Sequence, residues 1–166
     1  ILAGVIYPIV MGWQWGGGWL ASIGFHDFAG STLVHSTGGA AAFAGIMILG
    51  PRFGRFTKSG VPTPIKPFAA SSIPLVTIGV FVLWLGWFGF NGGSQLALGS
   101  FTDAVSISTI FINTNLAACG GVLAAAVVTR SMFGKTDVIQ MLNGAIGGLV
   151  AITAEPLAPS PLTAIL

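Results

Sequence analysis

Apolar residues are grouped in long runs along the chain, and short polar or glycine-rich connections separate the runs. The runs near 31 to 50, 73 to 90, 105 to 128 and 138 to 154 can each cross a hydrocarbon layer of about 30 Å as a helix. A shorter run, 1 to 13, predicts part of another span. Stretches inside these runs do not alternate in polarity as the strands of a membrane β-barrel do. The pattern predicts an all-α, polytopic transmembrane helical bundle.

The composition excludes an ordinary soluble protein. Hydrophobic residues make up 54% of the chain and charged residues 6%, whereas soluble domains carry about 25% charged residues. The mean hydropathy is +0.91. The single cysteine, Cys119, lies inside an apolar run, so it predicts no intrachain disulfide and matches no metal-ligand spacing. We expect neither a metal nor a cofactor.

The basic residues predict how the chain is oriented in the membrane. All six lie in two connections that are an even number of spans apart, so they share one side, which the positive-inside rule makes cytoplasmic. The linkers 14 to 30 and 91 to 104 contain Asp27 and Asp103 but no basic residue, which places them outside. Six scattered cations are too few for a nucleic-acid surface. The basic residues are Arg52, Arg55, Lys58 and Lys66 in the first connection, and Arg130 and Lys135 in the second.

Both ends of the chain predict a fragment of a single, larger membrane domain. Residue 1 is Ile rather than Met, and the run 1 to 13 is too short for a complete span. At the other end, residues 162 to 166 follow a proline-rich turn and resemble the opening of a further helix.

One histidine lies inside a predicted span. His35 shares a helix face with Gly38, Gly39, Ala42 and Gly45, and small residues mark close helix contacts in lipid. We therefore expect the imidazole to point into the bundle. An ionisable residue within a span is costly and marks a functional site by default, but a structural histidine bonded to a backbone carbonyl accounts for this helix equally well.

The outer linker contains two kinds of candidate residue. Asp27 precedes a helix and is typical of a cap, and cation recruitment is the less favoured interpretation. Trp13, Trp15 and Trp19 are typical of interface anchors, although one of them could offer its π face to a small cation, worth up to about 2 kcal/mol when desolvated. His26 is expected at the surface.

The span 73 to 90 ends in an aromatic cluster followed by residues suited to a helix stop and by a serine. Composition favours an interfacial aromatic belt for residues 87 to 94. Phe90 shares a helix face with Leu83 and two glycines, a stripe that could line a narrow apolar passage. Asn113 and Thr114 are expected to make interhelical hydrogen bonds.

Several segments together resemble the Amt/Mep/Rh ammonium transporter family. Residues 27 to 35 read Asp-Phe-Ala-Gly-Ser-Thr-Leu-Val-His, with Gly-Gly at 38 and 39, and residues 50 to 55 read Gly-Pro-Arg-Phe-Gly-Arg. Trp-Gly-Gly-Gly at 15 to 18, Gly-Trp-Phe-Gly-Phe-Asn-Gly-Gly-Ser at 86 to 94, and Asn-Thr at 113 and 114 follow the order of the family's segments. The resemblance covers essentially the whole chain.

The resemblance implies an eleven-span, inverted-repeat fold that forms homotrimers with one pore in each subunit, of which this chain would supply the fourth to the eighth span. It also implies roles for individual residues. Trp15 and Ser94 would belong to an outer ammonium recruitment site, Phe90 to a pair of gate phenylalanines, and His35 to a pair of pore histidines. Asp27 would act near the outer site mainly through structure. The other gate phenylalanine would precede residue 1, and the second histidine would follow residue 166.

The implied function is transport of ammonium or ammonia rather than an enzymatic reaction: outer recruitment of the ion, deprotonation, and passage of ammonia through an apolar pore, with the proton relayed by histidine. An ammonium sensor of the same fold and an Rh-type channel for neutral gases are the alternatives, and a haem enzyme using His26 and His35 is strongly disfavoured because the two lie in different environments. The expected partners are ammonium, the lipid bilayer, further copies of the subunit and a cytoplasmic regulatory protein. The expected location is the plasma membrane, which is the inner membrane in a bacterium.

Overall fold

The structure is a computed structural model that describes residues 1–53 and 69–166. Within these residues it contains helices and no strands. Arg55, Lys58 and Lys66, which the charge pattern places in a cytoplasmic connection, lie outside the described residues. In chain order the elements are the π-helix η1 (Leu2–Ile6), α1 (Tyr7–Gln14), α2 (Trp19–Ser22), the π-helix η2 (Ser31–Ser36), α3 (Thr37–Leu49), α4 (Ile73–Gly93), α5 (Phe101–Phe133), α6 (Val138–Ile152) and α7 (Pro161–Ile165).

Three helices are long and apolar enough to span a membrane among the described residues: Ser31–Leu49, which joins η2 to α3, Ile73–Gly93 and Phe101–Phe133. The apolar helix Val138–Ile152 is shorter. At 1.5 Å per residue, the 33 residues of α5 extend about 50 Å. This length exceeds the hydrocarbon thickness, so the ends of α5 reach beyond the apolar layer.

The helix α5 is longer at both ends than the sequence pattern predicts. It begins at Phe101 rather than near 105 because Ser100 and Asp103 form a reciprocal capping box, in which each side chain accepts from the other's backbone N–H at 3.1 Å. Asp103 therefore lies in the first turn of α5 and not in a linker. The helix ends at Phe133, where Gly134 adopts a left-handed conformation with φ of 72°.

The helix α4 also continues past its predicted end, to Gly93. The expected stop at Asn91 and Gly92 is wrong because both residues are buried inside the helix against α5. Asn91 donates from Nδ2 to Thr114 Oγ1 at 3.0 Å, which confirms an interhelical hydrogen bond at Thr114. A Cβ at Gly92 would overlap the ring of Phe111, so glycine is needed for this close approach.

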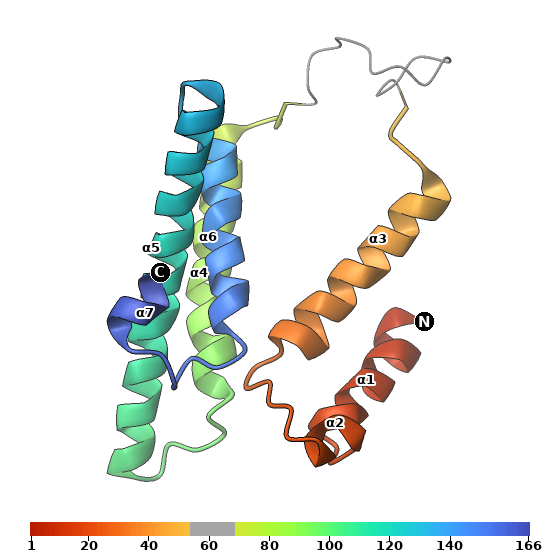
Figure 1. The fold of residues 1–166 in the computed structure, drawn as a ribbon, viewed down its shortest axis with the longest axis vertical. Helices are drawn as coiled ribbons and strands as arrows, with labels where there is room; N and C mark the ends of the chain where they lie inside the picture. The colour runs from red at the N-terminus through yellow and green to blue at the C-terminus, as the bar shows by residue number, and fades with distance from the viewer. Residues whose placement is uncertain (54–68) are drawn as a thin grey trace.

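The four main helices run in alternating directions, as Figure 1 shows. The end of α3, the start of α4, the end of α5 and the start of α6 lie at the upper end of that view. Arg52 and Lys135, which follow α3 and α5, are therefore at one end, and Asp27 and Asp103 are at the other. This arrangement is the one expected from the positive-inside rule.

Helices α5 and α6 pack through glycines at very close range. A Cβ at Gly121 would overlap the carbonyl oxygen of Gly144, and a Cβ at Gly148 would overlap that of Ala117. The predicted close helix contact at Gly144 and Gly148 is confirmed. Helices α4, α5 and α6 lie side by side as one bundle, as Figure 1 shows.

We expect Gly148→Ile to destabilise the full-length protein by about 2–4 kcal/mol, because the added side chain must push the α5 backbone away at Ala117. Thermal unfolding in detergent measures the change. The matched control is Gly147→Ile on the same helix, where an added Cβ meets no atom within 4 Å. Equal unfolding temperatures for the two variants would contradict the close contact.

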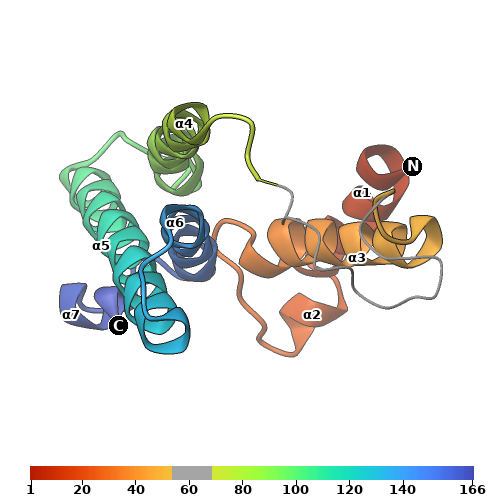
Figure 2. The same ribbon diagram turned by 90° about the horizontal axis from the view of Figure 1, so that it is seen from above.

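Helix α3 lies apart from this bundle except near its start, as Figures 1 and 2 show from two directions. The small-residue face that was expected to pack along its length is exposed at Gly38 and Gly39 in the described chain. Only the first turns approach the bundle, through η2 and the end of α6, and His35 lies in that part. The packing expected along the whole face is therefore found only at His35.

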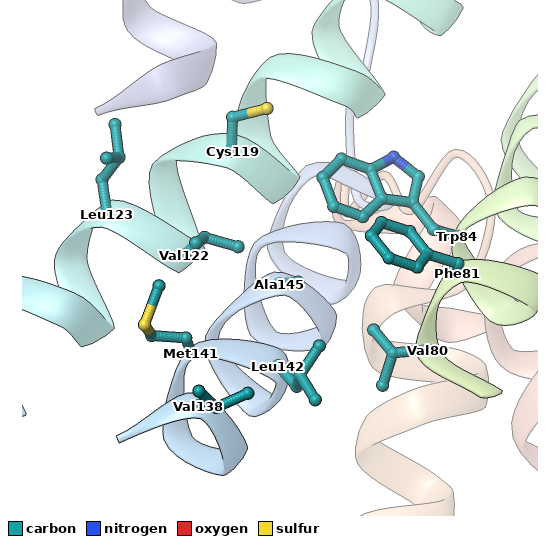
Figure 3. Close-up of a pocket in the computed structure, with 10 residues that line it drawn as sticks. All are labelled: Val80, Phe81, Trp84, Cys119, Val122, Leu123, Val138, Met141, Leu142 and Ala145. Carbon is teal, nitrogen blue, oxygen red and sulfur yellow. The ribbon is translucent and has the colours of Figure 1, made fainter. Parts of the chain in front are cut away.

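An apolar groove of about 410 Å³ lies between α4, α5 and α6, and Figure 3 shows the side chains that line it. Cys119 is half-buried in its wall. The lining contains no polar surface that could hold a small cation. This groove is consequently not a candidate for the substrate site. Its residues are Val80, Phe81, Trp84, Cys119, Val122, Leu123, Val138, Met141, Leu142 and Ala145.

Candidate functional site

The loop before α3 is built around one buried carboxylate. The side chain of Asp27 is 1% exposed, and each of its oxygens accepts two backbone N–H groups. Oδ1 accepts from Gly30 and Ser31 at 3.0 and 2.9 Å, and Oδ2 accepts from Thr32 and Leu33, both at 2.8 Å. These are the orphan donors of the first turn of η2. With both oxygens occupied and covered, the carboxylate has no free face for a cation.

The same loop is tied to the end of α6. Phe28 N–H donates to the carbonyl of Ala154 at 2.7 Å, and Ala29 N–H donates to that of Thr153 at 3.0 Å. One turn further on, the Ser31 hydroxyl donates to the carbonyl of Val150 at 2.8 Å. The start of the span that contains His35 is thus fixed to α6.

An outer cavity of about 530 Å³ lies between the end of α1 and the end of α4. Its lining brings together Trp15 and Ser94, 79 positions apart in the sequence. The indole Nε1–H of Trp15 donates to the backbone oxygen of Asp27 at 2.8 Å, which fixes the plane of the ring. The Ser94 hydroxyl donates to the carbonyl of Phe90 at 2.8 Å, so its oxygen lone pairs stay available. The full lining is Gln14, Trp15, Phe28, Ser94 and Leu96.

His35 packs against two aromatic rings of α4, Trp87 and Phe90, whose own centroids are 5.9 Å apart. It stacks on Trp87 with ring centroids 5.0 Å apart and planes at 19°, and it meets Phe90 edge to face at 5.5 Å and 72°. The imidazole is half-buried. Its position results from the π-helical turn of η2, in which the Gly30 carbonyl accepts from the backbone N–H groups of both Val34 and His35 at 3.0 Å.

The tautomer of His35 follows from its one polar side-chain contact within residues 1–53 and 69–166. Nδ1 lies 3.1 Å from the carbonyl oxygen of Gly30. A carbonyl can only accept, so Nδ1 carries the hydrogen, and in the neutral ring Nε2 carries the lone pair. Gly30 has a φ of 110°, and a Cβ there would overlap Val34. Glycine at this position therefore allows the turn that presents the carbonyl to the ring.

The indole that stacks on His35 is itself held by a buried polar network. Trp87 Nε1–H donates to Thr153 Oγ1 at 2.8 Å. Thr153 also lies 3.2 Å from Asn91 Oδ1 and 2.6 Å from the carbonyl oxygen of Leu149, and Asn91 continues to Thr114. Because these groups are buried and bonded, the network locks the orientation of Trp87.

The structure groups the predicted residues in two places joined by Phe90. Trp15 and Ser94 line the outer cavity, while His35 lies against the ring of Phe90, whose carbonyl accepts from Ser94. Asp27 lies behind both as an anchor. His26 is exposed, with 58% of its side chain accessible, and its Nε2 lies 3.1 Å from Glu155 Oε2. It shares no site with His35, and among the described residues no cluster could hold a metal ion.

Sequence reasoning missed Trp87, Thr153 and Gln14. Trp87 lies three residues before Phe90 on one helix face, a spacing that could have indicated a second ring beside His35. Thr153 is 66 residues from Trp87, and no local pattern indicates their contact.

Long apolar helices with exposed apolar surfaces define this chain as part of a multi-pass helical membrane protein. The family model described as the Ammonium Transporter Family matches residues 1–166. The chain belongs to that family, whose named relatives are transport proteins rather than enzymes.

Curated relatives include the putative ammonium transporter sll1017 of Synechocystis sp., which is 46% identical over 157 residues, and ammonium transporter Amt2 of Archaeoglobus fulgidus, 44% identical over 164 residues. Each alignment covers 93% of this chain and 34% of the relative, so the chain spans about a third of their length.

Solved structures agree with the fold. A Sensor Amt Protein superposes with a TM-score of 0.86 at 38% identity, covering 97% of this chain and 40% of that one. Mep2 of Candida albicans superposes with a TM-score of 0.81 at 35% identity, covering 97% and 34%. The fold is therefore that of ammonium transporter structures.

Proposed function

We propose that the full-length protein transports ammonium or ammonia across the plasma membrane. In this proposal Trp15 and Ser94 recruit the ion in the outer cavity, Phe90 separates that cavity from the passage, and His35 handles the proton. The observation that carries the proposal is the imidazole of His35, packed against Trp87 and Phe90 with Nδ1 bonded to Gly30. The pore-forming unit is a subunit of a homotrimer.

The energy balance favours passage of the neutral molecule. Moving an isolated ammonium ion into an apolar passage costs tens of kcal/mol, whereas a cation–π contact contributes about 2 kcal/mol. Recruitment therefore cannot drive the intact ion through. Ammonia is uncharged, so an ion that leaves its proton behind avoids most of this cost. Potassium has no proton to lose and is rejected by the same argument.

His35 is suited to this step in two respects. An imidazole is the side chain that proteins use most often to accept and release protons. With Nδ1–H bonded to Gly30, Nε2 is the nitrogen that can accept a proton or a hydrogen bond. In the proposed step, ammonium gives a proton to a base next to the passage and continues as ammonia, while the proton is relayed onward by way of His35, so that ammonia and a proton both cross and positive charge is moved.

A sensor is the second candidate, because one of the similar structures bears the name Sensor Amt Protein. A sensor would bind ammonium in the outer cavity and pass little or none of it. An Rh-type channel would pass ammonia without charge. The three differ in flux and in current, not in the recruitment site.

The test is a current measurement on the full-length protein in proteoliposomes. An ammonium gradient is expected to produce a current that potassium chloride does not produce. The pH change in the lumen of the proteoliposomes, recorded in the same experiment, indicates which species is transported. Ammonium binding without flux would replace transport by sensing. Flux of ammonia without current would replace it by neutral gas conduction.

A further inference from the structure

Gln14 is a polar residue that none of the proposed roles uses. It is the last residue of α1 and lines the outer cavity together with Trp15 and Ser94. Its side-chain oxygen Oε1 is buried and has no hydrogen-bond partner in the parts of the chain that the structure describes. A buried acceptor without a donor is uncommon in a folded protein and indicates a donor supplied from elsewhere.

The cavity is otherwise poor in acceptors. The N–H of Trp15 and the carboxylate of Asp27 are both used inside the protein, so Trp15 offers only its π face and Asp27 offers nothing. Phe28 and Leu96 are apolar. Besides Gln14, only Ser94 has a side-chain oxygen that can accept a hydrogen bond among these residues. Ammonium carries four N–H donors, which one hydroxyl cannot satisfy.

We propose that the side-chain amide oxygen of Gln14 is a hydrogen-bond acceptor for ammonium in the outer cavity and sets the affinity of recruitment. Because Oε1 is buried in this structure, contact with the ion includes a half-turn of the terminal amide, whose torsion is broad and nearly two-fold, that brings Oε1 to the cavity. The bound ion then meets the Gln14 oxygen, the Ser94 oxygen and the face of Trp15. This assignment rests on the proposed recruitment site and adds to it a residue that selects a cation with N–H donors.

The test replaces Gln14 with leucine, which has a similar volume and no acceptor, in the full-length protein. Hydrogen bonds to charged groups are among the stronger ones, so we expect the KM of the ammonium-induced current to rise about tenfold. The maximal current should change little, because Phe90 and His35 are untouched. Gln14→Glu keeps an acceptor oxygen and adds charge, and its KM should be equal to or below that of the wild type.

The matched control is Gln140→Leu, the same change at an exposed position at the other end of the bundle. It should leave the KM unchanged. A Gln14→Leu variant with wild-type KM would overturn the proposal while leaving transport intact. A similar rise in KM for Gln14→Leu and Gln14→Glu, with a lowered unfolding temperature in both, would also overturn it, because that result indicates a purely structural residue.

If the wild type gives no current, the transport proposal fails, and the Gln14 assignment is decided by binding. Calorimetric titration of the detergent-solubilised full-length protein with ammonium chloride is then expected to show the same tenfold loss for Gln14→Leu. Equal affinities would overturn the assignment.

Discussion

Replacing His35 with alanine in the full-length protein is expected to lower the ammonium-induced current about a hundredfold or more. A positioned acid or base contributes about 10² to 10⁴ to a rate that depends on proton transfer, and alanine offers no such group. Trp87 and Phe90 should remain in place, because Trp87 is held by Thr153 and not by the imidazole. Current recorded from proteoliposomes on a solid support measures the effect.

The other histidine supplies the matched control. His26→Ala removes an exposed ring whose Nε2 contacts Glu155 Oε2 at the surface, and exposed polar contacts of this kind contribute little. Its current should equal that of the wild type. A His35→Ala variant that keeps the wild-type current and the wild-type rejection of potassium would remove His35 from the mechanism.

Asp27→Ala is expected to destabilise the full-length protein by about 3–5 kcal/mol. Four backbone N–H groups lose their carboxylate acceptor at once. The loop that bonds Trp15 is then no longer tied to the first turn of η2 by this side chain. Asp27→Asn keeps one acceptor oxygen, so its loss should be smaller. Thermal unfolding in detergent gives the stability, and the KM of the current shows whether the carboxylate also binds ammonium.

Asp103→Ala is the control for this substitution. Asp103 also accepts backbone N–H, but it serves a single cap at a half-exposed helix start, and losing a cap costs about 1 kcal/mol. If Asp27→Ala lowers the free energy of unfolding by a similarly small amount, the four hydrogen bonds of Asp27 do not hold the loop together. A raised KM in Asp27→Asn at unchanged stability would assign Asp27 to recruitment instead.

The helices could be predicted because the bilayer imposes a simple requirement on every span. An apolar run of sufficient length must satisfy its backbone internally and therefore becomes helical, which is why α3, α4, α5 and α6 lie on the predicted runs. Helix ends were harder to predict, because a capping pair such as Ser100 and Asp103 acts through side-chain geometry. The exact end of α4 depends on the partners of Asn91 and Gly92 in another helix.

For the candidate site, too, one part could be predicted from the sequence and another part could not. His35 could be singled out because an imidazole within a span is rare and costly. Its surroundings could not be predicted, because Trp87 is oriented by Thr153 across a long sequence separation and the outer cavity combines α1 with the end of α4. Such contacts depend on how helices pack, and a single sequence does not encode them in any local pattern.

The bond between His35 and Gly30 limits how a proton can move through this ring. Since the carbonyl occupies Nδ1, only Nε2 of the imidazole is left to exchange a proton in the proposed mechanism. A proton taken up at Nε2 must leave from Nε2 as well, unless the Nδ1 bond opens. A single ring held in this way takes up and releases a proton at the same nitrogen and does not conduct it from Nε2 to Nδ1. Onward movement of the proton therefore requires a second base on the Nε2 side.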